Sequence, residues 1–322
     1  MKLAIIGTGK IVHDALDALQ HVPDIELTSV FARPKSREKA EALAKEWHIP
    51  HVYTDYAQLL AEDAADFVYI GLVNTVHYDY AKQALEAGKH VIVEKPFAPT
   101  YDEVKELVEL AEKQHCMLLE AVTLLYLPNF RAMQEAIPEL GTIHAVQANY
   151  SQYSSRYDKY RAGVVLPAFD PAQAGGALYD INIYNLNLIC GLFGAPTSAT
   201  YTANIGFNGV DTSGVATLCY DGFFATAVGA KDSASRGYCI VQGEDGWMEL
   251  EGAPNELPRV VVHAGGKDCV VESNGYENRM VHEFQAFAKI FATGDWAAVR
   301  RSNKQSLCVA KLVDELRKNA GI

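Results

Sequence analysis

The sequence lacks a basic patch, a long apolar run and a paired-cysteine motif, and each absence excludes a class of protein. Its 322 residues carry 28 basic and 40 acidic side chains, which gives a formal net charge of −12. We therefore expect neither nucleic acid nor an anionic membrane as a partner, because both require clustered basic residues. No apolar run approaches the roughly 20 residues that span a bilayer, so we expect no membrane segment.

Cysteine usage and the amino terminus argue against a secreted protein. The six cysteines are widely spread, without a C-x-x-C pair, and only Leu3–Ile6 form an apolar run before Gly7. Such a run is too short for a signal-peptide core. We therefore expect a cytoplasmic protein with reduced thiols in its core. His48 and His51 have no Cys or acidic cluster beside them, so we predict no metal site.

Predicted strands and helices alternate in the first third of the chain, as in a parallel sheet with crossover helices. The expected strands are Lys2–Ile6, Leu27–Phe31, Phe67–Gly71, His90–Val93 and Met117–Ala121. The expected helices are Val12–Gln20, Ser36–Trp47, Tyr56–Ala61, His77–Ala87 and Tyr101–Gln114. Ser36 suits a helix N-cap, and Gly88 suits a helix C-terminus.

After about residue 122, strands follow one another and predict a mostly antiparallel sheet. The expected strands are Ile143–Tyr153, Ser198–Ile205, Thr212–Tyr220, Phe223–Ala230, Gly237–Gln242, Gly246–Glu251 and Val260–Ala264. Asp221-Gly222 is a hairpin turn signal. The expected helices are Ala177–Leu192, Asn278–Ala292 and Ser302–Ala320.

This pattern predicts an α/β protein of two domains, which the chain length also favours. We expect residues 1–121 to form a Rossmann dinucleotide-binding domain. Residues 122–322 should form an α+β domain with a large, mostly antiparallel open sheet.

The first predicted strand runs directly into a glycine turn, Gly7-Thr8-Gly9-Lys10-Ile11-Val12. Glycines let the backbone turn sharply and approach a pyrophosphate, and the following helix start offers free N–H groups. Val12 stands where this pattern usually has a third small residue. The glycine turn lies between a strand and an amphipathic helix, and this position favours dinucleotide binding over an ordinary strand–helix turn.

No acidic residue stands at the end of the second predicted strand, where an NAD-specific site holds the ribose 2′-hydroxyl. Arg33, Lys35 and Ser36 follow this strand instead. Because an arginine can hold a 2′-phosphate at two points, we predict NADP as the preferred cofactor, with NAD possible. The alternative is a solvated basic loop on an acidic protein.

The run His90–Val93 ends on Glu94-Lys95-Pro96, which places a lysine where a buried strand ends. Open parallel sheets bind their ligands just outside the carboxyl ends of the strands. Together with the glycine turn, this lysine indicates a nicotinamide-dependent oxidoreductase.

Three blocks of the sequence resemble the Gfo/Idh/MocA oxidoreductases and together span nearly the whole chain. They are Ile70–His77 with Ala87–Val91 and Glu94–Pro96, then Leu119–Ala121 with Tyr126–Pro128, and finally Gly175–Tyr184. The resemblance implies a sugar, polyol or cyclic diol substrate and a homodimer or higher homo-oligomer, with residues 122–322 as the domain for substrate binding and oligomerisation. Three positions depart from the family's usual proline, arginine and glycine, namely Val73, Leu125 and Asn182.

The resemblance also implies three catalytic residues. Lys95 matches the lysine near the nicotinamide, Asp180 matches the helix acid, and Tyr184 falls where many members have an acid/base histidine. Members similar to dihydrodiol dehydrogenases have tyrosine there. Asp180 and Tyr184 are four residues apart, so on a helix they share a face. The alternative is a structural Lys–Asp ion pair beside a core tyrosine.

The sequence thus predicts an NAD(P)-dependent dehydrogenase or reductase acting on CH–OH groups. The alternative is a dinucleotide-binding regulator or ligand sensor without turnover. The tyrosine-rich run Tyr150–Arg161 is compatible with either a substrate wall or a subunit interface. The predicted cofactor contacts are Gly7, Thr8, Gly9, Lys10, Ile11, Arg33, Ser36, Leu72, Asn74, His77, Glu94 and Lys95.

Overall fold

The structure, a computed structural model, describes all 322 residues and divides them into two compact units. The first unit comprises Met1–Val122 and Asn278–Leu307, and the second comprises Thr123–Glu277 and Cys308–Ile322. A boundary drawn at residue 121 does not include the return of residues 278–307 to the first unit. Sequence periodicity locates an element along the chain but does not show which unit it packs against.

Six parallel strands form the sheet of the first unit, in the order β3-β2-β1-β4-β5-β6. This order is that of a Rossmann fold, and it reverses between β1 and β4, where such sheets bind ligands. The fold prediction for this part of the chain is therefore confirmed. The strands are β1 (Lys2–Ile6), β2 (Glu26–Phe31), β3 (His51–Tyr53), β4 (Phe67–Ile70), β5 (His90–Glu94) and β6 (Leu118–Ala121).

Helices that follow these strands begin close to the predicted positions. In α5, Thr100 accepts a hydrogen bond from the Glu103 N–H and the Glu103 side chain accepts one from the Thr100 N–H, which closes a capping box. Gly88 has φ +75° just after α4 and ends that helix as predicted. The helices are α1 (Lys10–Leu19), α2 (Arg37–Glu46), α3 (Tyr56–Glu62), α4 (His77–Glu86), α5 (Tyr101–Lys113) and α9 (Met280–Thr293).

The second unit contains an eight-stranded sheet in the order β14-β13-β12-β11-β7-β10-β9-β8. All neighbours are antiparallel except β7 and β10, which confirms a large, mostly antiparallel sheet. The strands are β7 (Ile143–Ser151), β8 (Ser198–Ile205), β9 (Asp211–Cys219), β10 (Phe224–Ala230), β11 (Tyr238–Gly243), β12 (Gly246–Glu251), β13 (Arg259–Ala264) and β14 (Lys267–Val271).

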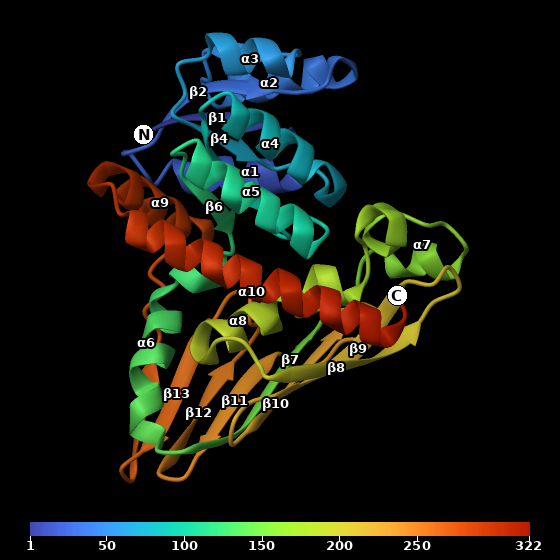
Figure 1. Ribbon diagram of the computed structural model, residues 1–322, viewed down its shortest axis with the longest axis vertical. Coiled ribbons are helices and arrows are strands. Elements are labelled where there is room, and N and C mark those ends of the chain that lie inside the picture. The colour runs from blue at the N-terminus through green and yellow to red at the C-terminus, as the bar shows by residue number, and fades with distance from the viewer. The chain divides into compact units, whose positions relative to one another are not determined.

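Helices cover one face of this sheet. Figure 1 shows α6 (Pro128–Ala136) running alongside β13, and α8 (Ile183–Phe193) packs against β7 and β10. Alternate residues that point to the other face, such as Phe224 and Trp247, remain exposed. We call this other side the open face of the sheet.

Several elements were missing from the sequence prediction. β3 and β14 are short edge strands, and β14 is exposed along most of its length instead of alternating between buried and exposed residues. The helices α6 and α7 (Tyr157–Arg161) are also new, and α10 (Trp296–Ala320) begins before the predicted Ser302. The strands β3 and β14 and the helix α7 are too short for periodicity to identify them, whereas α6 buries Phe130, Met133 and Ala136 at helical spacing and was overlooked.

None of the six cysteines forms a disulfide, but the prediction that all lie in the core is wrong. Cys116, Cys190 and Cys239 are buried, whereas Cys219 and Cys269 are exposed. Both exposed residues lie in strands near the sheet edge, where one side of the strand faces water. None of the helices is long and apolar enough to cross a membrane.

Candidate active site

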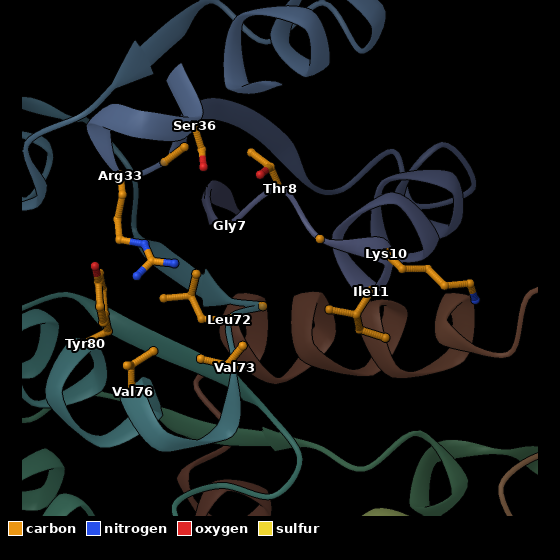
Figure 2. A pocket seen from close by; sticks show the side chains of 13 residues that line it. Gly7, Thr8, Lys10, Ile11, Arg33, Ser36, Leu72, Val73, Val76 and Tyr80 are labelled. Carbon is orange, nitrogen blue, oxygen red and sulfur yellow. The ribbon is translucent and has the colours of Figure 1, made fainter. Parts of the chain in front are cut away.

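A pocket of about 380 Å³ lies in the first unit, at the carboxyl ends of β1, β2 and β4. Its walls come from the turn after β1, the loop after β2 and the segment that joins β4 to α4 (Figure 2). This is the place where the strand order reverses. The lining residues are Gly7, Thr8, Gly9, Lys10, Ile11, Ala32, Arg33, Ser36, Gly71, Leu72, Val73, Val76 and Tyr80.

Two glycines allow the chain segments beneath the pocket to pass close together. Gly7 has φ +125°, and a Cβ there would stand 2.6 Å from the carbonyl oxygen of Gly71. A Cβ on Gly71 would lie 2.8 Å from Cγ2 of Val12. Gly71 therefore supplies the space that the usual small residue would leave at position 12, which explains why Val12 is accommodated.

The start of α1 offers unpaired donors to this pocket. The helix begins at Lys10, and its N-cap Gly9 has no side chain that could cap it. The first N–H groups of a helix have no intrahelical partner and meet the positive end of the helix dipole, an arrangement that suits a pyrophosphate. The ammonium of Lys10 points away from the other lining side chains and pairs with Asp14 at 3.2 Å (Figure 2).

Positive charge and hydroxyl groups gather where an NAD-specific site would have an acid. The Arg33 guanidinium extends toward Leu72, and Thr8 and Ser36 present hydroxyls to the same space (Figure 2). No carboxylate lines the pocket. Ser36 occupies the N-cap position of α2, but its side chain makes no capping hydrogen bond, contrary to the predicted cap. A 3₁₀ turn from Pro34 to Ser36 precedes the helix and turns this residue toward the pocket.

Tyr80 lines the pocket and was missed by the sequence analysis. Its ring packs against Tyr56 and Phe31, with centroids 4.7 and 5.8 Å away, and the Tyr56 hydroxyl donates to its carbonyl oxygen at 3.0 Å. Burial raises the pKa of Tyr80, and the charge of Arg33 lowers it. The spacing of Val73, Val76 and Tyr80, three and four residues apart, is the helical pattern that could have identified them.

Four predicted cofactor residues do not line the pocket: Asn74, His77, Glu94 and Lys95. Asn74 begins a half-buried 3₁₀ turn. His77 is fully buried, and its Nδ1 and Nε2 lie 2.9 Å from the Pro96 carbonyl oxygen and 3.1 Å from that of Leu72. Burial lowers the pKa of His77. This histidine joins the pocket loop to the loop that carries Lys95, so its place in the structure is a supporting one.

Two buried carboxyl groups hold the backbone on both sides of Lys95. Glu94 accepts hydrogen bonds from the Tyr69 hydroxyl at 2.7 Å and the Lys95 N–H at 3.3 Å, and burial raises its pKa. Glu120 accepts from the Phe97 N–H at 2.9 Å and the Ser306 hydroxyl at 2.5 Å. Burial raises the pKa of Glu120 to about 7.

The other two predicted catalytic residues lie in the second unit, whereas Lys95 lies in the first. Asp180 belongs to a π-helical turn, Leu178–Asn182, and Tyr184 to the first turn of α8. The segment that carries both residues is therefore part π-helical and not one continuous α-helix, as the spacing argument assumed. Asp180 pairs with Lys231 at 2.8 Å, and the Tyr184 ring meets Tyr150 edge-to-face, with centroids 5.8 Å apart.

A buried carboxyl group anchors the start of the π-helical turn. Asp211 accepts hydrogen bonds from the Leu178 N–H at 2.7 Å and the Tyr201 hydroxyl at 2.8 Å. Burial raises the pKa of Asp211 to about 6. Gly176 has φ +114°, and a Cβ there would stand 2.0 Å from Oδ1 of Asp211. The Gly175-Gly176 pair thus permits the approach of the helix start to this acid.

The two ends of the tyrosine-rich run Tyr150–Arg161 lie in different environments. Tyr160 stacks between Phe169 and Phe207, with centroids 4.8 and 4.5 Å away, and its hydroxyl donates to Asn208 at 2.7 Å. This end of the run forms a local apolar core. Tyr150, at the other end, lies beside Tyr184.

Comparison with known proteins identifies the same family that the sequence motifs resemble. Residues 1–122 match the Gfo/Idh/MocA model of the oxidoreductase family with an NAD-binding Rossmann fold, and residues 130–249 match the C-terminal domain of that family. A scyllo-inositol 2-dehydrogenase (NADP(+)) of Bacillus subtilis is 33% identical over 100% of this chain and 98% of its own. A D-xylose 1-dehydrogenase (NADP(+)) of Haloferax volcanii is 30% identical over 99% and 97%.

A solved structure shares the fold over the whole length. The 3-ketoreductase from Actinomadura kijaniata, in complex with NADP and TDP-benzene, aligns with a TM-score of 0.86 and 22% identity, covering 99% of this chain and 97% of its own. The matching family models define the class of the protein, an oxidoreductase with an NAD-binding Rossmann domain. The chain belongs to the Gfo/Idh/MocA family. The predicted family and the predicted NAD(P)-dependent dehydrogenase or reductase activity are confirmed.

Proposed function

We propose that this protein is an NADP-preferring dehydrogenase that transfers a hydride between nicotinamide and the hydroxyl/carbonyl pair of a polyol, sugar or cyclic diol. The observation that carries the cofactor preference is a pocket without any carboxylate, into which Arg33 extends. Two NADP-dependent relatives, named for scyllo-inositol and D-xylose, support the substrate class.

The residues of the pocket fit the cofactor in three parts. The free N–H groups at the start of α1 would bind the pyrophosphate, and Arg33 with Ser36 would bind the 2′-phosphate. The ring of Tyr80, held by Tyr56 and Phe31, would form a wall for the adenosine. When bound, the nicotinamide supplies or accepts the hydride.

The remaining task of the chain is to move a proton and to hold the reacting oxygen. Tyr184 donates the proton to the carbonyl oxygen in reduction and accepts it from the alcohol in oxidation. The ammonium of Lys95 stabilises negative charge on that oxygen, and Asp180 orients the reacting groups. His77, Glu94 and Glu120 keep the Lys95 segment in place through their backbone contacts.

We further propose that residues 1–121 bind the cofactor and residues 122–322 contact the substrate in a cytoplasmic homodimer or larger homo-oligomer. The open face of the eight-stranded sheet supports the oligomer, because Phe224 is 50% exposed and Trp247 is 40% exposed there. Large apolar side chains gathered on one face of a sheet mark an interaction surface.

A substrate screen tests the proposed function. Inositols, aldoses and cyclic diols are offered with NADP⁺ and with NAD⁺, and the absorbance of the reduced nicotinamide is followed. We expect turnover of at least one polyol or sugar, faster with NADP⁺. Tyr184→Phe should slow the reaction by about 10²–10⁴-fold with unchanged cofactor binding. If none is turned over but polyols alter cofactor affinity, the protein is a sensor and the proposal is wrong.

A further inference from the structure

Lys231, a buried residue that the sequence analysis did not identify, forms an ion pair with Asp180. Lys231 directly follows β10, and its side chain is only 2% exposed. Its Nζ stands 2.8 Å from Oδ2 of Asp180, donates to the carbonyl oxygen of Ala168 and lies 4.5 Å from the centroid of the Phe169 ring. A lysine so completely buried requires a partner for its charge.

The sheet fixes the position of this lysine. The Lys231 N–H donates to the Thr212 carbonyl oxygen at 2.9 Å, and the Lys231 carbonyl oxygen accepts from the Ser154 N–H at 2.9 Å. Hydrogen bonds on both sides of the residue leave its backbone little freedom. The ammonium is therefore presented from a backbone position that is hydrogen-bonded on both sides, at the first residue after β10.

The π-helical turn that carries Asp180 is tied to the same sheet at both ends. Asp211 accepts from the Leu178 N–H at its start, and the Asn182 amide donates to the Ala227 carbonyl oxygen at 2.9 Å at its end. The Asp180 side chain is 43% exposed. One oxygen thus faces the buried lysine, and the side chain as a whole remains partly exposed.

Two other acids near Lys231 use their oxygens on different donors. Asp211 accepts from the Tyr201 hydroxyl and the Leu178 N–H. Asp232 accepts from the hydroxyls of Thr212 and Ser213, both at 2.7 Å. Asp180 is the carboxylate in direct ion-pair contact with Lys231.

We infer that Lys231 is a positioning residue, whose buried ammonium holds the Asp180 carboxylate in one orientation for the reaction. The inference rests on the proposed role of Asp180 in turnover. Lys231 itself touches no substrate in this scheme and acts only through Asp180. The asparagine at position 182, where the family usually has glycine, contributes by fixing the turn on β10.

A double-mutant cycle separates this role from general support of the fold. Lys231→Met retains the length of the side chain and removes its charge, and it is combined with Asp180→Asn. With the best substrate of the screen and NADP⁺, we expect Lys231→Met to lower kcat by about 10- to 100-fold with little change in KM or NADPH affinity. In the Asp180→Asn background it should cost nothing further. Lys231→Arg should recover part of the loss, and Lys267→Met, an exposed lysine in β14, should have no effect.

The unfolding transition of the same four proteins gives a readout that needs no substrate. Asp180→Asn leaves Lys231 buried without its counter-ion, so this variant should unfold at lower urea than the double variant. Additive effects on unfolding, or normal kcat in Lys231→Met while Asp180→Asn is inactive, would overturn the inference. Normal kcat in Asp180→Asn would instead remove Asp180 from the proposed mechanism, and the positioning role with it. The unfolding cycle would then report on the ion pair alone.

Discussion

At the scale of single residues, the proposed preference for NADP depends on Arg33. It extends into a space that contains hydroxyl groups and no carboxylate. A guanidinium binds a phosphate through charge-assisted hydrogen bonds, which contribute about 1.5–3 kcal/mol. The ribose 2′-hydroxyl of NADH offers no such charge, so the contribution is specific to NADPH.

Arg33→Ala should therefore weaken NADPH binding by about tenfold to a hundredfold and leave NADH binding nearly unchanged. Fluorescence titration with both cofactors measures this difference. Lys35→Ala is the matched control, because Lys35 lies in the same loop but does not line the pocket. If Arg33→Ala leaves the preference as it was, the 2′-phosphate is held elsewhere.

At the scale of elements, the packing of α1 on the sheet depends on the pair Val12 and Gly71. The usual motif has a small residue on the helix, whereas here the glycine stands at the end of β4 and faces a fully buried valine. The helix and the strand approach each other equally closely when the small residue, Gly71, follows the strand and the larger one, Val12, lies on the helix. The geometry of the glycine turn is thus a property of the helix–strand pair.

Gly71→Ala should push α1 away from the sheet and lower both stability and cofactor affinity, since its Cβ would stand 2.8 Å from Val12 and 3.1 Å from Tyr69. Adding Val12→Ala should restore part of both losses. Thermal unfolding and NADPH titration of the single and double variants provide the measurement. Gly9→Ala, whose Cβ would meet nothing within 4 Å, should leave the unfolding midpoint unchanged. No recovery in the double variant would contradict this account.

At the scale of the whole molecule, buried acids make stability depend on pH. Burial raises the pKa of Glu120 to about 7, above the value of about 4.3 expected in the unfolded chain. The folded state therefore binds a proton more tightly than the unfolded state. The contribution of this group to stability is complete below the unfolded pKa and is lost as the pH rises toward 7.

Glu120→Gln, which can still accept from Phe97 and pair with Ser306, should remove this loss. The difference in unfolding free energy between variant and wild type should grow in favour of the variant from pH 5 to pH 8, by at most about 1.4 kcal/mol per pH unit. Urea unfolding at several pH values measures it. Parallel pH profiles of the two proteins would show that Glu120 does not titrate as described.

The proposed homo-oligomer depends on the open face of the sheet. Trp247 is 40% exposed there and stacks on His263, with ring centroids 3.7 Å apart. Trp247→Glu places a charge in this face and should yield monomers in sedimentation velocity. Val164→Glu, at an exposed valine in a loop, is the control and should keep the wild-type assembly. An unchanged oligomer in Trp247→Glu, or a monomeric wild type, would exclude this face as the interface.

The sequence by itself determined the fold class and the glycine turn that lines the pocket. Strand–helix alternation gave the parallel sheet, consecutive strands gave the antiparallel one, and the glycine turn with Arg33 located most of the pocket wall. These features are local, because a few neighbouring residues set the periodicity and the backbone conformation on which they depend.

Only the tertiary structure determined which residues far apart in the chain contact one another. Lys231 meets Asp180, Ser306 meets Glu120, and residues 278–307 return to the first unit. Each of these contacts joins positions far apart in the chain, and its formation depends on how sheets and helices pack. Burial, which raises the pKa of Glu120 and Asp211, likewise arises only when the whole chain surrounds them.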